Sequence, residues 1–184
     1  MRNKALSTLF VFNGVFLLAG SLLGPLYAVF VGNITKGIAS ITISWSVFLF
    51  STTIFTMLVA KVGDQIKEKE YMLIAGYLIR AVVWLSYIFI HDFYLLIIAQ
   101  FILGIGEALG TPAFEAIFAE HLDRGKHIFE YSEWKVLSNI ILAVGTLLGG
   151  VIVERFGFSP LFFFMSLLAM ISCVGVWLKP RKLL

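Results

Sequence analysis

Two ionisable residues, Arg80 and Glu107, lie inside long apolar stretches of the sequence. A charge in the middle of a membrane costs at least about 2.5–3.5 kcal/mol on insertion scales, so a charge in such a stretch indicates a function or a partner. Two interpretations are equally open. Arg80 and Glu107 could neutralise each other permanently, or Glu107 could bind and release a proton while burial and an approaching cation pull its protonation in opposite directions.

Uncharged polar residues share helical faces with these charges. At 100° per residue, three faces emerge: Asn13, Gly20, Gly24 and Tyr27; Gln100, Gly104, Glu107 and Thr111; and Ser132, Lys135, Asn139 and Thr146. Polar groups that face lipid are unfavourable, so these faces should line a water-filled cavity or another helix, and for Asn or Thr alone the helix contact is the simpler explanation. The candidate substrate-cavity residues are Asn13, Tyr27, Gln100, Glu107, Thr111 and Asn139.

The composition places these groups in a membrane. Of the 184 residues, 60% are hydrophobic and 14% are charged, against about 45–50% and about 25% in soluble domains. A mean hydropathy of +0.96 excludes a soluble enzyme or a free nucleic-acid-binding domain, because a small domain exposes much of its surface. The single cysteine, Cys173, excludes an internal disulfide and a CxxC pair. No HExxH, GxSxG or Walker A motif occurs, so we expect no metal, no cofactor and no catalytic site.

Six apolar stretches are long enough to cross a bilayer as helices, since a span needs roughly 20 apolar residues. They are residues 6–31, 39–60, 71–90, 93–119, 134–153 and 160–178. Only short loops remain between them. We therefore expect an all-α integral membrane protein with one six-helix transmembrane domain over residues 1–184.

The basic residues predict how the chain is oriented. One side of the expected bundle carries Arg2, Lys4, Lys61, Lys67, Lys69, Arg124, Lys126, Lys179, Arg181 and Lys182, and the other side carries Lys36 and Arg155. The positive-inside rule then places both termini in the cytoplasm, and short loops suit an inner cell membrane. In this orientation Arg80 lies roughly 14 Å and Glu107 about 10 Å from the inner face of a ~30 Å core, so the two are within reach of each other.

The first and fourth spans share a pattern of glycine and proline. The segment Gly20–Pro25 reads GSLLGP, and the segment Gly106–Pro112 reads GEALGTP. The two spans cross the bilayer in opposite directions, and corresponding Gly/Pro interruptions in antiparallel segments indicate an inverted repeat with a substrate site near the midplane. Chance is the alternative, because transmembrane helices carry more Gly and Pro than soluble ones. We favour a 3+3 inverted repeat.

Three further segments give the chain a family resemblance. Residues 60–69, AKVGDQIKEK, are similar to the loop G-x-L-A-D-R-x-G-R-K, with Asp64 and Lys69 matching. Residues 100–106, QFILGIG, are similar to R-x-x-Q-G-x-G, with Gln100 where the family often has Arg. Residues 145–150, GTLLGG, are similar to the antiporter signature G-P-x-x-G-G. Over its whole length the chain resembles one half of a major facilitator superfamily (MFS) transporter.

The resemblance implies transport by alternating access. Gln100 in place of the arginine speaks against an arginine-based proton relay and leaves Glu107 as the candidate for proton coupling, and the GTLLGG segment favours efflux. In the family, the aspartate that matches Asp64 faces the fifth helix of the other half. The residues expected to control opening of the cavity, or to lie at the contact with a second copy of the chain, are Asp64, Lys61, Glu115, Lys135, Gly145 and Gly149.

The departure from the family is length, since members have two parallel halves of six spans each. A parallel homodimer would rebuild the full architecture around a twofold axis. The leading interpretation is therefore a homodimeric secondary transporter that moves a small organic solute against a proton gradient. Two alternatives are a non-transporting half that binds or regulates a larger transporter, and the N-terminal half of a twelve-helix transporter. An intramembrane enzyme lacks the necessary constellation of residues.

Overall fold

The computed structural model describes residues 4–66 and 68–179, with the backbone alone for residues 4, 5 and 64. All regular structure in this part of the chain is helical, and six helices are long and apolar enough to cross a membrane. The predicted all-α, six-span fold is therefore confirmed. The helices are α1 (Lys4–Leu23), α2 (Leu26–Ile34), α3 (Ile38–Val62), α4 (Lys69–Ser86), α5 (Phe93–Glu120), α6 (His127–Phe156) and α7 (Phe158–Trp177), with the 3-10 turns η1 (Gly63–Gln65) and η2 (Tyr87–Phe89).

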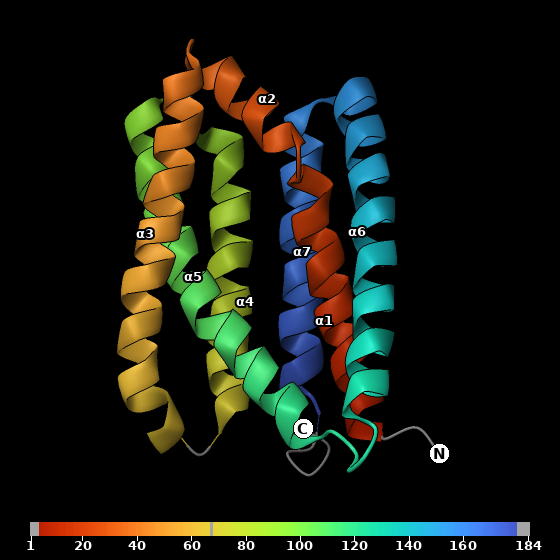
Figure 1. Ribbon diagram of the computed structural model, residues 1–184. Helices are drawn as coiled ribbons and strands as arrows, with labels where there is room; N and C mark the ends of the chain where they lie inside the picture. Colours follow the sequence, from red (N-terminus) through yellow and green to blue (C-terminus); the bar gives the residue numbers. More distant parts are fainter. Residues whose placement is uncertain (1–3, 67, 180–184) are drawn as a thin grey trace.

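The expected first span, residues 6–31, is broken into two helices. Gly24 adopts a positive φ of 24° and Pro25, which has no N–H to donate, follows it. The short helix α2 then runs obliquely across one end of the bundle toward the start of α3 (Figure 1). Pro112 in the corresponding motif does not break its helix, because α5 is continuous from Phe93 to Glu120. The expectation of two matching interruptions is therefore wrong for the fourth span.

The fifth span is also longer than its apolar core. Helix α6 begins at His127 rather than at residue 134, because the polar segment before Trp134 continues the same helix. Helix α1 begins and α7 ends at the same end of the bundle, which we call the terminal end (Figure 1). Helix α2 lies at the other end of the bundle, which we call the α2 end.

Helix pairing follows a simple rule in the described bundle. Helix α1 packs against α6 and α7, helix α5 packs against α3 and α4, and α4 packs against α7. The first three spans (α1, α3, α4) can be exchanged in order for the last three (α5, α6, α7). The contacts of α1 with α6 and α7 then become those of α5 with α3 and α4, and the contact between α4 and α7 is unchanged. The first helix of each triplet is thus packed into the other triplet.

Glycines permit the two closest crossings. A Cβ at Gly149 would lie 1.9 Å from the Leu22 carbonyl oxygen, so α6 and α1 touch through their backbones. A Cβ at Gly76 would lie 2.6 Å from the Gly110 Cα, so α4 and α5 do the same. Small residues at helix contacts are the common means of close packing in membranes, where lipid tails compete with apolar side chains.

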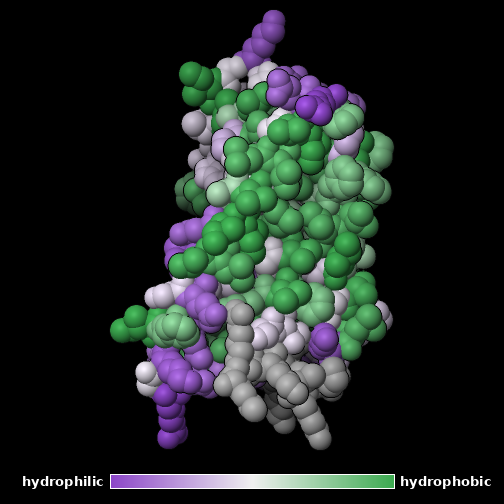
Figure 2. Space-filling view, turned by 90° about the vertical axis from the view of Figure 1, so that its right-hand side faces the viewer, coloured by the Kyte–Doolittle hydropathy of each residue, from purple (hydrophilic) through white to green (hydrophobic). Residues whose placement is uncertain are grey.

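The surface matches a bilayer. Figure 2 shows hydrophobic side chains covering the middle of the molecule and hydrophilic ones gathered at its two ends. Helices α3 and α6, which lie at opposite edges of the bundle in Figure 1, are the least covered spans. Only 11% and 17% of the residues in their apolar windows are buried, against 39–50% in the other four spans.

Candidate functional site

A cavity of about 560 Å³ lies between the two sets of helices and is lined by residues of every helix. It receives most of the predicted site residues, which are Asn13, Tyr27, Arg80, Gln100, Glu107, Thr111, Glu115 and Lys135. Aromatic side chains, including Phe16, Trp45 and Trp84, form much of the remaining wall. The cavity thus combines an apolar body with a few polar groups, which is typical of a small-molecule site.

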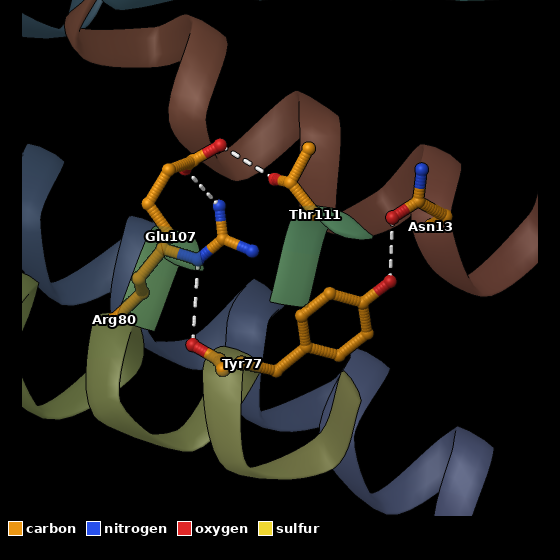
Figure 3. Close-up of polar contacts among 6 residues, drawn as sticks. Asn13, Tyr77, Arg80, Glu107 and Thr111 are labelled. Atoms are coloured by element: carbon orange, nitrogen blue, oxygen red, sulfur yellow. Dashed lines mark hydrogen bonds and ion pairs between the residues drawn. The ribbon is translucent and has the colours of Figure 1, made fainter. Parts of the chain in front are cut away.

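The structure brings Arg80 and Glu107 together in this cavity. Arg80 Nη1 donates to Glu107 Oε2 at 2.5 Å, and the hydroxyl of Thr111 donates to Glu107 Oε1 at 2.5 Å (Figure 3). Arg80 Nε also donates to the carbonyl oxygen of Gly76 at 3.3 Å. We call Arg80, Glu107 and Thr111 the charged cluster.

Glycines of α5 make room for the guanidinium group. A Cβ at Gly110 would lie 2.5 Å from Arg80 Nη2, and a Cβ at Gly106 would lie 2.9 Å from Arg80 Cγ. The GxxxG spacing of these glycines therefore has a specific reason here. It lets a charged side chain of α4 cross against the backbone of α5.

The two charges are not equally accessible. The Arg80 side chain is only 9% exposed and lies over the ring of Phe16, with 4.1 Å between Cζ and the ring centroid, whereas the Glu107 side chain is 29% exposed. The cavity consequently meets more of the carboxylate than of the guanidinium group. A cation over an aromatic face is itself stabilised by the ring quadrupole, which helps to hold Arg80 in place.

A hydrogen bond between Tyr77 and Asn13 also connects α1 to this region. Tyr77 Oη donates to Asn13 Oδ1 at 2.5 Å (Figure 3), and the ring of Tyr77 stacks on Phe16 with 4.2 Å between centroids. Asn13, which lines the cavity, is thereby held by a buried residue of α4. Tyr77 was not expected from the sequence, although it lies one helical turn before Arg80 and so shares its face.

A neutral polar cluster lies nearer the α2 end. Gln100 Nε2 donates to the hydroxyls of Tyr27 (2.7 Å) and Tyr87 (3.1 Å), and the Tyr27 hydroxyl donates to Ser44 Oγ at 2.7 Å. All four residues are buried. We call them the neutral cluster. It fastens α2, α3, η2 and α5 to one another, and Ser44 and Tyr87 were not expected from the sequence.

Glu115 and Lys135 border the cavity toward the terminal end, and both are exposed. Lys61 is exposed near the end of α3 and does not belong to the cavity lining. The side chain of Asp64 lies outside the described residues. The gating roles of these four residues stay predictions.

Asn139 is placed on the exposed surface of α6, outside the cavity lining, and Ser138 takes the expected position. The rotation of α6 explains this difference. Gly145 and Gly149 are buried against Ser21 and Leu22 of α1 within the same chain. Ser138 precedes Gly145 by two turns and therefore shares its face, while Asn139 is turned away by 100°.

The comparisons with known proteins identify the family. The Major Facilitator Superfamily model matches residues 5–183.

The chain belongs to the Major Facilitator Superfamily. It is 26% identical over 157 residues to an uncharacterized MFS-type transporter of Bacillus subtilis (strain 168), YitZ, and the match covers 84% of this chain and 93% of that relative. The relative is therefore of similar length. Membership places the chain among membrane transporters, and its six spans correspond to one half of the superfamily architecture.

Superfamily membership also gives meaning to the cavity. In MFS proteins the substrate and coupling-ion sites lie near the midplane, at the interface between structural repeats. The charged cluster joins α4 to α5, which belong to different triplets of spans. The neutral cluster likewise joins the first triplet to Gln100 of the second.

Proposed function

We propose that this superfamily member is a secondary active transporter of a small organic solute. It works by alternating access as a parallel homodimer. It lies in an inner cell membrane, with both termini in the cytoplasm. The cavity carries the proposal, because it combines polar and charged groups with aromatic walls inside an otherwise apolar bundle. Such groups are expensive in a membrane unless they face water, a substrate or one another.

The pairing of helices supports an inverted repeat within the chain. Contacts of α1 with α6 and α7 correspond to contacts of α5 with α3 and α4 under exchange of the two triplets. A transporter half built in this way places its cavity where the triplets meet. The break at Gly24 then makes the first helix the less regular member of the pair.

The exposed faces of α3 and α6 support a homodimer. Both helices contribute to the cavity lining, and they lie at opposite edges of the bundle (Figure 1). On each helix, several small or polar residues lie next to the cavity side at 100° per residue, and on α3 the exposed Leu49 and Met57 lie among them. The small or polar residues are Thr42, Ser46, Thr53 and Ala60 on α3, and Ser132, Asn139, Ala143 and the half-buried Gly150 on α6.

Large apolar residues lie roughly 60–100° further round the same two helices. Ile54 and Phe50 of α3 are 52% and 70% exposed, and Ile140 of α6 is 56% exposed. Large aliphatic residues suit lipid, whereas small and hydroxyl-bearing residues suit a helix partner. A twofold axis through the cavity would set α3 of one protomer against α6 of the other, twice, and would close the cavity.

Cross-linking tests this arrangement. In a Cys173→Ala background, Thr53→Cys combined with Ala143→Cys should give a covalent dimer in membranes, because the two positions lie at similar depths on the facing strips. The matched control moves each cysteine by one residue, to Ile54→Cys with Val144→Cys, which are also exposed but turned by 100°. Equal cross-linking of both pairs, or none in the first, would contradict the homodimer and favour a different partner or a missing second half.

Glu107 is the proposed coupling residue. Its carboxylate lines the cavity and is held by Arg80 and Thr111, so protonation would remove the charge that pairs with Arg80 and weaken that contact. In proteoliposomes with an imposed pH gradient, Glu107→Gln should abolish proton-driven solute movement while the protein stays folded. Transport that keeps its pH dependence in Glu107→Gln would leave the charged cluster a structural pair. The same vesicles, prepared in both orientations, test whether the direction is efflux.

A further inference from the structure

Gln100 of the neutral cluster has one amide atom that the fold leaves without a hydrogen bond. The residue is 1% exposed and its Nε2 group donates to Tyr27 and Tyr87. Its carbonyl oxygen, Oε1, is buried and has no hydrogen-bond partner among the described residues. Gln100 also lines the cavity, and its Oε1 atom is buried beneath the cavity surface, so a solute reaches this acceptor only when a side chain of the wall moves.

The orientation of the Gln100 amide follows from the donors around it. Ser44 Oγ donates to the carbonyl oxygen of Ile41 at 3.0 Å, and it therefore accepts the proton of the Tyr27 hydroxyl. Because the Tyr27 proton is used in this way, the Tyr27 oxygen must accept from Gln100, and only Nε2 can donate. The chain of donors thus fixes Oε1 as the free end.

A buried acceptor without a partner is unfavourable in the empty site, so a bound donor that satisfies it gains more than it would at a hydrated surface. The requirement is also selective. A site built to bond a donor discriminates against an otherwise similar molecule that lacks one, because the acceptor is then left unpaired.

The surroundings of Gln100 favour a positive charge on that donor. Glu107 lies two helical turns away on the same face of α5, roughly 10 Å along the axis, and it is the more exposed partner of its ion pair. Trp45, Trp84 and Tyr27 line the same cavity as Gln100, and the ring of Tyr27 lies 5.5 Å from that of Trp45 between centroids. Aromatic faces stabilise both cations and ring-bearing molecules.

We propose that Gln100 Oε1 is a recognition point for the transported solute, and that this solute is a ring-bearing organic cation with an N–H donor, a protonated amine rather than a quaternary ammonium. This inference deepens the proposed transport function and rests on it, because it assigns the substrate class of the same cavity. The ammonium group donates to Gln100 Oε1, and the ring lies against the aromatic wall.

A matched pair of probes tests the donor requirement. 1-Naphthylmethylammonium and its N,N,N-trimethyl counterpart have the same ring and charge, and only the first has N–H donors. Calorimetric titration of the full chain in nanodiscs should show the first binding about tenfold more tightly, which corresponds to about 1.4 kcal/mol. Equal affinities, tighter binding of the trimethyl probe, or no binding of either probe would overturn the inference.

Variants locate the effect at Gln100. In Gln100→Met the preference for the N–H probe should fall to about onefold. In Gln100→Glu, which keeps an acceptor oxygen, the preference should persist. The glutamate variant keeps the test informative if the methionine variant folds poorly. Gln65→Met is the matched control, since Gln65 is exposed in η1 and should leave the tenfold preference unchanged. A preference that survives in a folded Gln100→Met protein would overturn the assignment to Gln100.

A third probe tests the orientation of the amide. 1-Naphthylacetate carries acceptors and no donor, and it should bind more weakly than the ammonium probe. Tighter binding of the acetate would mean that Nε2 faces the cavity, which would overturn the inference. Failure of transport in proteoliposomes with the N–H preference intact would count against the transporter proposal alone, while transport without that preference would count against the donor requirement alone.

Discussion

The charged cluster and the neutral cluster occupy the same cavity and are held in different ways. The neutral cluster is fully buried, and its hydrogen bonds connect four separate segments of the chain. The charged cluster joins α4 to α5 and leaves the Glu107 carboxylate partly open to the cavity. A fully buried network of neutral groups suits a fixed structure, whereas a half-exposed ion pair can change its protonation and its partners. Recognition of the solute is accordingly proposed for the neutral cluster, and proton coupling for the charged cluster.

The largest expected effect is at the charged cluster. Arg80→Met should lower the free energy of unfolding by about 3–5 kcal/mol, because it leaves Glu107 as an uncompensated charge among helices. Denaturation of the purified protein in detergent, followed by circular dichroism, measures the loss. The double variant Arg80→Met/Glu107→Gln should recover most of it, and a double variant as unstable as the single one would show that packing of Arg80 on Phe16 matters more than charge.

The next effect concerns the space that α5 provides for Arg80. Gly110→Ala should destabilise the protein by about 1–3 kcal/mol, since its Cβ would lie 2.5 Å from Arg80 Nη2. Gly32→Ala in α2 is the matched control, because nothing lies within 4 Å of a Cβ there, and it should be neutral or stabilising by up to about 1 kcal/mol. Equal thermal shifts in the two variants would show that Arg80 can move aside without loss.

The smallest effects should separate a buried from a half-exposed hydrogen bond. Tyr27→Phe should cost about 1–2 kcal/mol, because it leaves Ser44 and the Gln100 amide each without one partner. Tyr77→Phe should cost about 0.5–1 kcal/mol, since water from the cavity can replace the lost bond to the half-exposed Asn13. The same denaturation assay ranks the two, and the reverse order would contradict the view that the neutral cluster is the more rigid.

Some of this site could be predicted from the sequence and some could not. Apolar length alone located the six spans, and similar depths in the bilayer predicted that Arg80 and Glu107 would be in reach of each other. Depth arguments work because a helix rises by a constant 1.5 Å per residue. They require no knowledge of which face a helix turns inward.

Rotation about a helix axis was harder to predict. Asn139 was expected in the cavity and Ser138 lies there instead, because the contact of Gly145 and Gly149 with α1 fixes the rotation of α6. A helical wheel gives relative angles and cannot supply that reference direction. The two proline motifs differ for a similar reason. Pro25 follows a glycine with positive φ, whereas Thr111 before Pro112 stays within a continuous helix.

The hairpin of α4 and α5 bears on how the chain enters a membrane during synthesis. Only residues 90–92 separate η2 from α5, and Gly76 and Gly110 bring the two helices into backbone contact. Arg80 can therefore meet Glu107 while both helices are still beside the translocon, before either charge reaches lipid. We expect α4 to insert poorly into the membrane on its own and to become stable there once α5 has emerged from the ribosome. Nascent chains that end before Glu107 should therefore leave the translocon later than Arg80→Leu chains of equal length.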